Sequence, residues 1–152
     1  GSPEFSIGSV DESGWTYIAD YAESAGATPE YIEREKQAQL ATMRKRRAQY
    51  TPVHPPVDPH GRIVIVVDDG LATGATMISA LHALRAKKPK KLIAAVPVAP
   101  PDTLHKVSGY ADETICLHTP EYFQAVGQFY RDFPQVEDEE VVAILREGKQ
   151  GR

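Results

Sequence analysis

The sequence predicts an α/β protein, a twisted parallel sheet flanked by helices. The first observation is that, from residue 61 on, short runs rich in Val and Ile alternate with segments of helical spacing. Strands that alternate with helices form parallel sheets with right-handed crossovers. The second is that the run Ile63–Val67 leads through a small-residue loop into an amphipathic stretch at 77–85. We therefore expect a buried strand at 63–67, a helix to about residue 88, a strand at 92–98, a helix at 102–108 and a strand at 114–117.

Residues 6–60 are expected to form an N-terminal arm before a core at 61–148, with a tail at 149–152. Turn residues at 11–14 predict a hairpin from strands at 6–10 and 15–19. Thr28 fits an N-cap before Pro29, so a helix should run from there to about Tyr50. Its apolar positions are sparse, so one face must be solvated or must pack against something that the sequence does not reveal. Four prolines make 51–60 a linker.

The remaining segments are the two ends of the chain. Residues 1–5 resemble the remnant of an expression vector. Acidic residues at 137–140 precede apolar residues at a helical period, which predicts a last helix at 138–147. The cationic run 44–47 falls in the last turns of the long helix. There it is more simply explained by the helix dipole than by a patch that binds phosphate or acids.

Composition limits the partners. The net charge of −4 disfavours nucleic acid. No apolar run approaches the roughly 18 residues of a membrane helix, so no membrane partner is expected. There is no secretory signal, and the single cysteine fits a reducing cytosol, which predicts a cytoplasmic location. That cysteine, Cys116, lies in an apolar strand pattern, which favours a buried structural thiol over a reactive one.

Two acids and a small-residue loop follow the first core strand. Asp68 and Asp69 stand at its carboxyl end, where parallel sheets bind ligands. The loop then leads into a helix N-terminus, which favours a phosphate through its backbone N–H groups and its dipole. Carboxylates accept hydrogen bonds from sugar hydroxyls. The pattern predicts a site for a phosphorylated sugar, although one aspartate could instead cap the helix.

The thirteen residues 64–76, Val-Ile-Val-Val-Asp-Asp-Gly-Leu-Ala-Thr-Gly-Ala-Thr, resemble the signature of phosphoribosyltransferases of the type I fold. That signature is four apolar residues, two acids and a Thr-Gly-x-Thr loop that binds phosphoribosyl pyrophosphate. The resemblance implies a glycosyltransferase of nucleotide metabolism, in which Asp68 and Asp69 hold the ribose hydroxyls and serve catalysis. It also implies that the 5-phosphate lies on the N–H groups of Ala72, Thr73, Gly74, Ala75 and Thr76.

The resemblance implies Mg²⁺ as the cofactor and a nitrogenous base as the second substrate. The ion would be held mainly by the pyrophosphate and the sugar, with Asp68 and Asp69 as near or water-mediated partners. Members that act on 6-oxopurines carry a third aspartate where this chain has Ala72, so such a base is disfavoured. Residues 120–133 resemble the segment that covers the base, which implies contacts from Phe123, Val126, Phe129 and Tyr130. Aromatic core packing or a dimer surface is an equal alternative there.

The family core normally begins with a strand, a helix and a second strand whose loop grips the pyrophosphate. The resemblance places residues 6–10 after these elements, which implies a core that is incomplete at the N-terminus. We therefore expect weak or no turnover by this chain and an exposed sheet edge, which leaves a homo-oligomer open. Residues 62–146 also resemble bacterial phosphoribosyltransferases whose substrate is not established. Two alternatives remain: a non-catalytic module that senses phosphoribosyl pyrophosphate, and a phosphotransfer protein with Asp68 as acceptor.

Overall fold

The computed structural model describes residues 4–5, 7–53 and 55–150. The predictions for residues 1–3, for Ser6 and for 151–152 lie outside these residues. The strands are β1 (Glu4–Phe5), β2 (Gly8–Val10), β3 (Thr16–Ile18), β4 (Ile63–Val67), β5 (Lys91–Val98) and β6 (Glu113–His118). The α-helices are α1 (Pro29–Tyr50), α2 (Ala75–Arg85), α3 (Pro101–Ser108) and α4 (Asp138–Gln150), and Val126–Phe129 forms the 3₁₀ helix η1.

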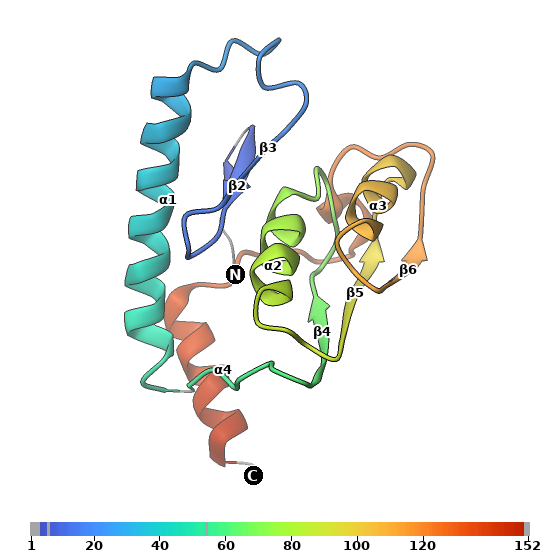
Figure 1. Cartoon of the computed structure of the whole chain (residues 1–152). Coiled ribbons are helices and arrows are strands. Elements are labelled where there is room, and N and C mark those ends of the chain that lie inside the picture. Colours follow the sequence, from blue (N-terminus) through green and yellow to red (C-terminus); the bar gives the residue numbers. More distant parts are fainter. Residues whose placement is uncertain (1–3, 6, 54, 151–152) are drawn as a thin grey trace.

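The core sheet has the strand order β4-β5-β6, and both pairs are parallel. Helices α2 and α3 are the crossovers, and Figure 1 shows them on the same side of the sheet. The α/β fold class and the three core strands predicted from the sequence are confirmed. The boundaries of these core elements differ from the prediction by no more than two residues, except that α2 ends at Arg85, about one turn earlier than expected.

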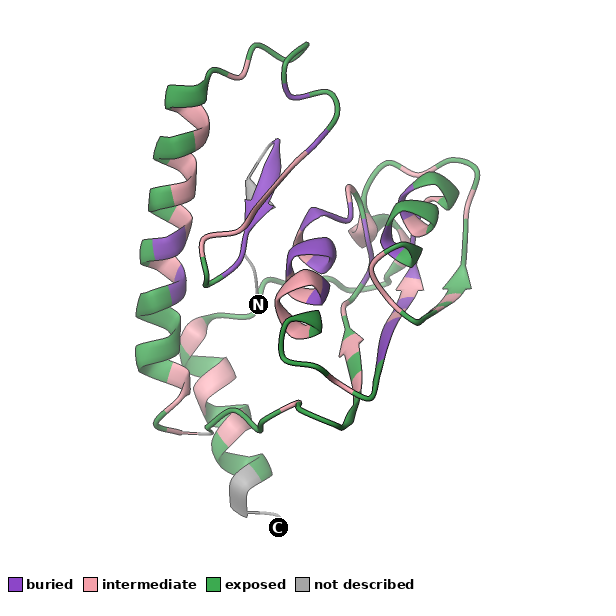
Figure 2. Ribbon diagram, in the orientation of Figure 1, coloured by how far each residue is buried: buried purple, intermediate pink, exposed green. Residues whose placement is uncertain are grey.

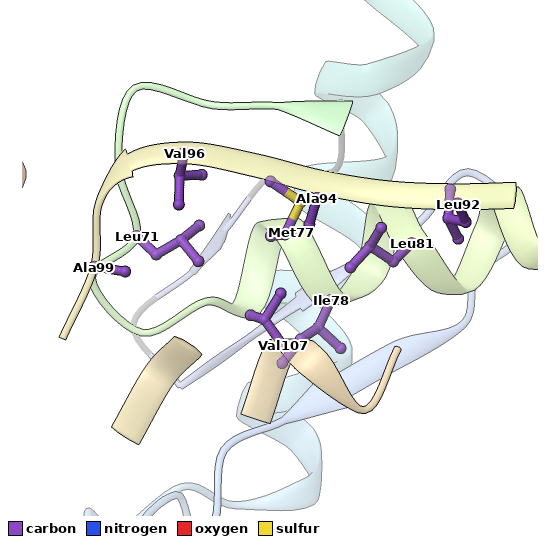
Figure 3. Packing of buried hydrophobic residues seen from close by; sticks show 9 residues of the cluster. All are labelled: Leu71, Met77, Ile78, Leu81, Leu92, Ala94, Val96, Ala99 and Val107. Carbon is purple, nitrogen blue, oxygen red and sulfur yellow. The ribbon is translucent and has the colours of Figure 1, made fainter. Parts of the chain in front are cut away.

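The hydrophobic core lies between this sheet and helices α2 and α3. Figure 3 shows Leu92, Ala94 and Val96 of β5 facing Met77, Ile78 and Leu81 of α2. Val107 of α3 and the loop residue Leu71 close the same cluster. Figure 2 shows burial concentrated on β2, β5 and α2, since these elements have packing partners on more than one side.

A second, antiparallel sheet packs on the outer side of α2. Strand β2 pairs with both β1 and β3, and β2 and β3 contact α2. The predicted hairpin therefore exists, but it carries an additional strand at Glu4–Phe5, inside the segment that the sequence suggests is a vector remnant. Helix α1 lies on the far side of this sheet, where Leu40 and Met43 pack with Val10, and α4 contacts α1.

The prediction that β4 is a buried strand was wrong. Ile63, Ile65 and Val67 are 58%, 58% and 73% exposed, while Val64 and Val66 are half-buried against the core. β4 is an edge strand, and the two crossover helices cover only one face of the sheet. On β6, Ile115 and Leu117 are likewise exposed. We call these five side chains the open face.

Cys116 is only half-buried, rather than buried as expected. It lies on the covered face of β6 and packs at the edge of the core, and its thiol donates to the His118 carbonyl at 3.3 Å. In the part of the chain that the structure describes, none of the helices combines the length and the apolarity that a bilayer span requires.

Candidate functional site

The two acids lie at the carboxyl end of β4, where the chain leaves the sheet. Asp68 directly follows β4, and its N–H still donates to the Ala95 carbonyl of β5 at 3.3 Å. Its carboxylate accepts the Asp69 N–H at 2.8 Å. Asp68 is half-buried and Asp69 is exposed, as the alternation of side chains along a strand requires. The pair therefore stands at the position that parallel sheets use for ligands.

Two contacts fix the loop that follows. The Leu71 N–H donates to the Val98 carbonyl at 3.0 Å, and the Leu71 side chain is 3% exposed. Thr103 of α3 donates its hydroxyl to the Ala72 carbonyl at 2.8 Å. Because the loop is tied to the end of β5 and the start of α3, its backbone is held in place by the rigid part of the fold.

Gly74 makes the turn from the loop into α2. It has a φ of +79°, and its carbonyl accepts the first intrahelical bond, from the Ile78 N–H at 2.9 Å. The N–H groups of the first three helical residues therefore have no acceptor within the helix. One of them, on Ala75, is directed at the Thr73 hydroxyl at 3.3 Å. The predicted residues Ala72–Thr76 thus bring backbone donors together at the positive end of a helix, which is suited to a phosphate.

The hairpin supports this helix end from the other side. The Ser9 hydroxyl donates to the Ala75 carbonyl at 2.6 Å and also contacts the Ser79 hydroxyl. Ser9 and Ser79 are fully buried. No sequence motif indicates this contact, because the two serines lie 70 residues apart. It ties the first turn of α2 to β2.

The predicted base segment contributes to the same end of the sheet. Phe123 stacks on Phe129 of η1 with 5.6 Å between ring centroids, and Phe129 meets His118 edge-on at 5.7 Å. His118, at the end of β6, was not among the predicted site residues. Tyr130 donates its hydroxyl to the Asp69 carbonyl at 2.5 Å. Segment 120–133 therefore meets the acid pair through Tyr130 and forms a row of aromatic rings beside β6.

The side chains at this site meet only part of what a hard cation such as Mg²⁺ requires. Among the described residues, no group of three or more His, Cys, Asp or Glu side chains is placed to hold a metal ion. Asp68 and Asp69 are adjacent oxygen donors, which Mg²⁺ accepts, but this ion requires about six ligands and keeps several waters. The residues fit a Mg²⁺ that a substrate brings with it, bound to the protein through these two acids or through water.

Two of the four residues in the cationic run 44–47 pair with other parts of the protein. Arg47 donates to Glu12 at 2.6 Å, which joins α1 to the hairpin turn. Arg46 lies 3.9 Å from Asp138 at the start of α4, and Asp138 also accepts the Tyr50 hydroxyl at 2.6 Å. These interactions join α1 to the hairpin turn and to α4.

Fold and loop together define an α/β protein in which one short loop joins two acids to a helix N-terminus. Residues 17–134 match the model of the phosphoribosyl transferase domain family, and the chain therefore belongs to that family. It is 39% identical over 147 residues to proteins of two strains of Mycobacterium tuberculosis, both provisionally named phosphoribosyl transferases. The match covers 94% of this chain, which spans only 32% of the length of those relatives.

A solved structure gives the same fold. The crystal structure of TT1426 from Thermus thermophilus superposes with a TM-score of 0.74 at 42% sequence identity. The superposition covers 95% of this chain and 69% of that chain. The resemblance inferred from residues 64–76 is thus confirmed for the family.

Proposed function

We propose that this chain is a phosphoribosyltransferase-type domain that binds the ribose 5-phosphate group of phosphoribosyl pyrophosphate and transfers phosphoribosyl to a nitrogenous base. Membership of the family supports the reaction class. The observation that carries the proposal is the geometry of residues 68–76, in which two acids and a helix N-terminus are only one short loop apart. A sugar phosphate presents a diol and a dianion, which require these two kinds of group.

Each part of the loop has a role in this proposal. The N–H groups at 72–76 hold the 5-phosphate, and Asp68 and Asp69 accept hydrogen bonds from the ribose hydroxyls. Displacement of pyrophosphate from C1 by a base nitrogen builds positive charge on the sugar. Two fixed carboxylates nearby favour that charge and orient the ring, so the work of the protein is placement and electrostatic stabilisation. Mg²⁺, bound with the substrate, would neutralise charge on the leaving pyrophosphate.

The base is proposed to lie against segment 120–133, with Phe123, Val126, Phe129 and Tyr130 as contacts. The aromatic row of Phe123 and Phe129 offers ring faces and edges of the kind that base stacking uses. Ala72 is exposed and carries no group that could pair with a base nitrogen. We therefore favour adenine, orotate or uracil over a 6-oxopurine.

Binding is tested by an amide NMR titration with ribose 5-phosphate and with a nucleoside 5-monophosphate. We expect ribose 5-phosphate to shift amides at 68–76, and the nucleotide to shift amides at 120–133 as well. Asp69→Asn should weaken ribose 5-phosphate by about ten- to a hundredfold, since hydrogen bonds to a charged group contribute about 1.5–3 kcal/mol. Asp20→Asn is the matched control, because that side chain is 91% exposed and lies outside residues 68–76 and 120–133.

Equal affinity of wild type and Asp69→Asn for ribose 5-phosphate would contradict the proposal that the Asp69 carboxylate binds the ribose hydroxyls. Turnover is assayed separately, with phosphoribosyl pyrophosphate, Mg²⁺ and a panel of bases. Tight binding without turnover would agree both with the weak turnover that the resemblance implies and with the other candidate, a module that senses phosphoribosyl pyrophosphate or regulates a partner. Binding and transfer are therefore measured on the same protein.

A further inference from the structure

A long-range hydrogen bond joins the base segment to the acid pair. The Tyr130 hydroxyl donates to the main-chain carbonyl of Asp69 at 2.5 Å, across 61 residues of sequence. The ring of Tyr130 is itself held in place: it meets Phe133 edge-on at 5.1 Å, and the Tyr130 N–H donates to the Gly127 carbonyl at 3.2 Å. Phe133 in turn packs against Gly127. The hydroxyl is therefore presented by a compact local unit.

The peptide that receives this bond is also clamped by packing. A Cβ added to Gly70 would lie 2.7 Å from Val126 Cγ1 and 2.9 Å from Val98 Cγ1, so only glycine lets these side chains close on the backbone here. On the other side of Asp69, its N–H donates to the Asp68 carboxylate. Among the described residues, no hydrogen bond or ion pair is made by the Asp69 carboxylate itself. Its position thus depends on the backbone that carries it.

We propose that Tyr130 is a positioning residue that fixes Asp69 for the ribose hydroxyls and links its position to the base segment. This role rests on the proposed function, because it assigns Asp69 to the sugar diol. A carboxylate on a fixed peptide binds a diol without first losing freedom, which is the benefit of a preorganised site.

Tyr130→Phe removes the hydroxyl and keeps the ring. We expect it to weaken ribose 5-phosphate about fivefold in calorimetry, as the loss of one hydrogen bond implies. Affinity for inorganic phosphate, which touches only the helix end, should stay within about twofold. Tyr122→Phe is the control: it deletes the same atom from a side chain that is 85% exposed in the same segment. It should change neither affinity.

A double-mutant cycle separates positioning from a general loss of structure. In an Asp69→Asn background, the effect of Tyr130→Phe on ribose 5-phosphate should fall below about twofold, because the two residues act as one unit. The role is overturned if Tyr130→Phe leaves ribose 5-phosphate unchanged, if it weakens phosphate equally, or if its effect persists in the Asp69→Asn background. The cycle detects these outcomes even if the variant is somewhat less stable.

A measurement without ligand keeps this role distinct from the proposed function. The carbonyl ¹³C resonance of Asp69 should move in Tyr130→Phe and stay in place in Tyr122→Phe. An unmoved resonance overturns the contact and the inference, while ribose 5-phosphate binding by the wild type would still stand. A wild type that binds phosphate but not ribose 5-phosphate overturns the proposed function, and the positioning role with it, whatever the resonance shows.

Discussion

At the scale of single residues, Gly74 shows why the phosphate loop needs its particular sequence. Its φ of +79° is unfavourable for any residue with a side chain, and an added Cβ would lie 2.8 Å from the Thr103 methyl and 3.1 Å from Val107. Gly26 has a similar φ of +82° but nothing within 4 Å of an added Cβ. The two positions therefore share the backbone strain and differ only in packing.

This comparison gives a stability prediction. Gly26→Ala should cost about 1 kcal/mol of unfolding free energy through its backbone alone. Gly74→Ala should cost about 1–3 kcal/mol more, because α3 must move to admit the methyl group. Urea denaturation of both variants measures the difference. Equal losses would mean that Thr103 and Val107 yield freely, and that α3 does not hold the loop.

Asp112 is expected to make the stability of the protein depend on pH in the acidic range. Two hydrogen bonds from the Arg85 guanidinium, at 3.1 Å each, and one from the Leu92 N–H at 2.7 Å hold the pKa of the Asp112 carboxyl below its ordinary value. A carboxyl whose pKa is lower in the folded protein than in the unfolded chain stabilises the fold above the unfolded value. That contribution disappears as pH falls through the folded pKa.

Asp112→Asn should therefore have a lower free energy of unfolding than wild type, by a constant amount at neutral pH. This difference between the two proteins should become smaller below about pH 4. Urea midpoints measured from neutral to acidic pH test this. Because Arg85 is the largest cause of the shift, the narrowing should be weaker in an Arg85→Gln background. A gap of constant size down to the lowest pH at which the protein folds would contradict the prediction.

At the scale of elements, prediction succeeded where local chemistry sets a boundary. Thr28 accepts the Tyr31 N–H at 3.1 Å and Pro29 begins α1, as the sequence indicates. It failed where distant segments decide. The sparse apolar residues of α1 did not indicate what the helix packs against. In the structure, α1 packs on the hairpin sheet, where Leu40 and Met43 contact Val10. Likewise the continuous Ile63–Val67 run could not show that only one face of β4 is covered.

The candidate site likewise has a part that the sequence could predict and a part that it could not. Residues 68–76 are contiguous, so their spacing carries the pattern of acids and donors. The Tyr130–Asp69 bond and the Ser9–Ala75 bond join segments that are 61 and 66 residues apart. Each uses a hydroxyl that is common in proteins and fits no motif. His82 is similar: its ring stacks on Trp15 at 3.7 Å, which places the hairpin turn on α2, and nothing in either local sequence predicts the pair.

At the scale of the whole molecule, we expect the open face to govern how the chain behaves in solution. It combines three exposed aliphatic side chains of β4 with two of β6, and both are edge strands. An exposed apolar patch on a sheet with unpaired edges favours association. We therefore expect the chain to self-associate with rising concentration and to bind an apolar dye such as anilinonaphthalene sulfonate.

Two threonines on this face should reduce both effects while leaving the core intact. Ile65 and Leu117 are 58% and 83% exposed, so Ile65→Thr with Leu117→Thr removes apolar surface but keeps side chains suited to strands. Sedimentation velocity should show less association, with the unfolding free energy changed by no more than about 1 kcal/mol, since little buried area is lost. Ile144→Thr is the matched control, because Ile144 is 56% exposed on α4, away from the sheet. If the double variant associates as strongly as the control, the open face is not the surface through which copies meet, and the edges of the strands must be tested in its place.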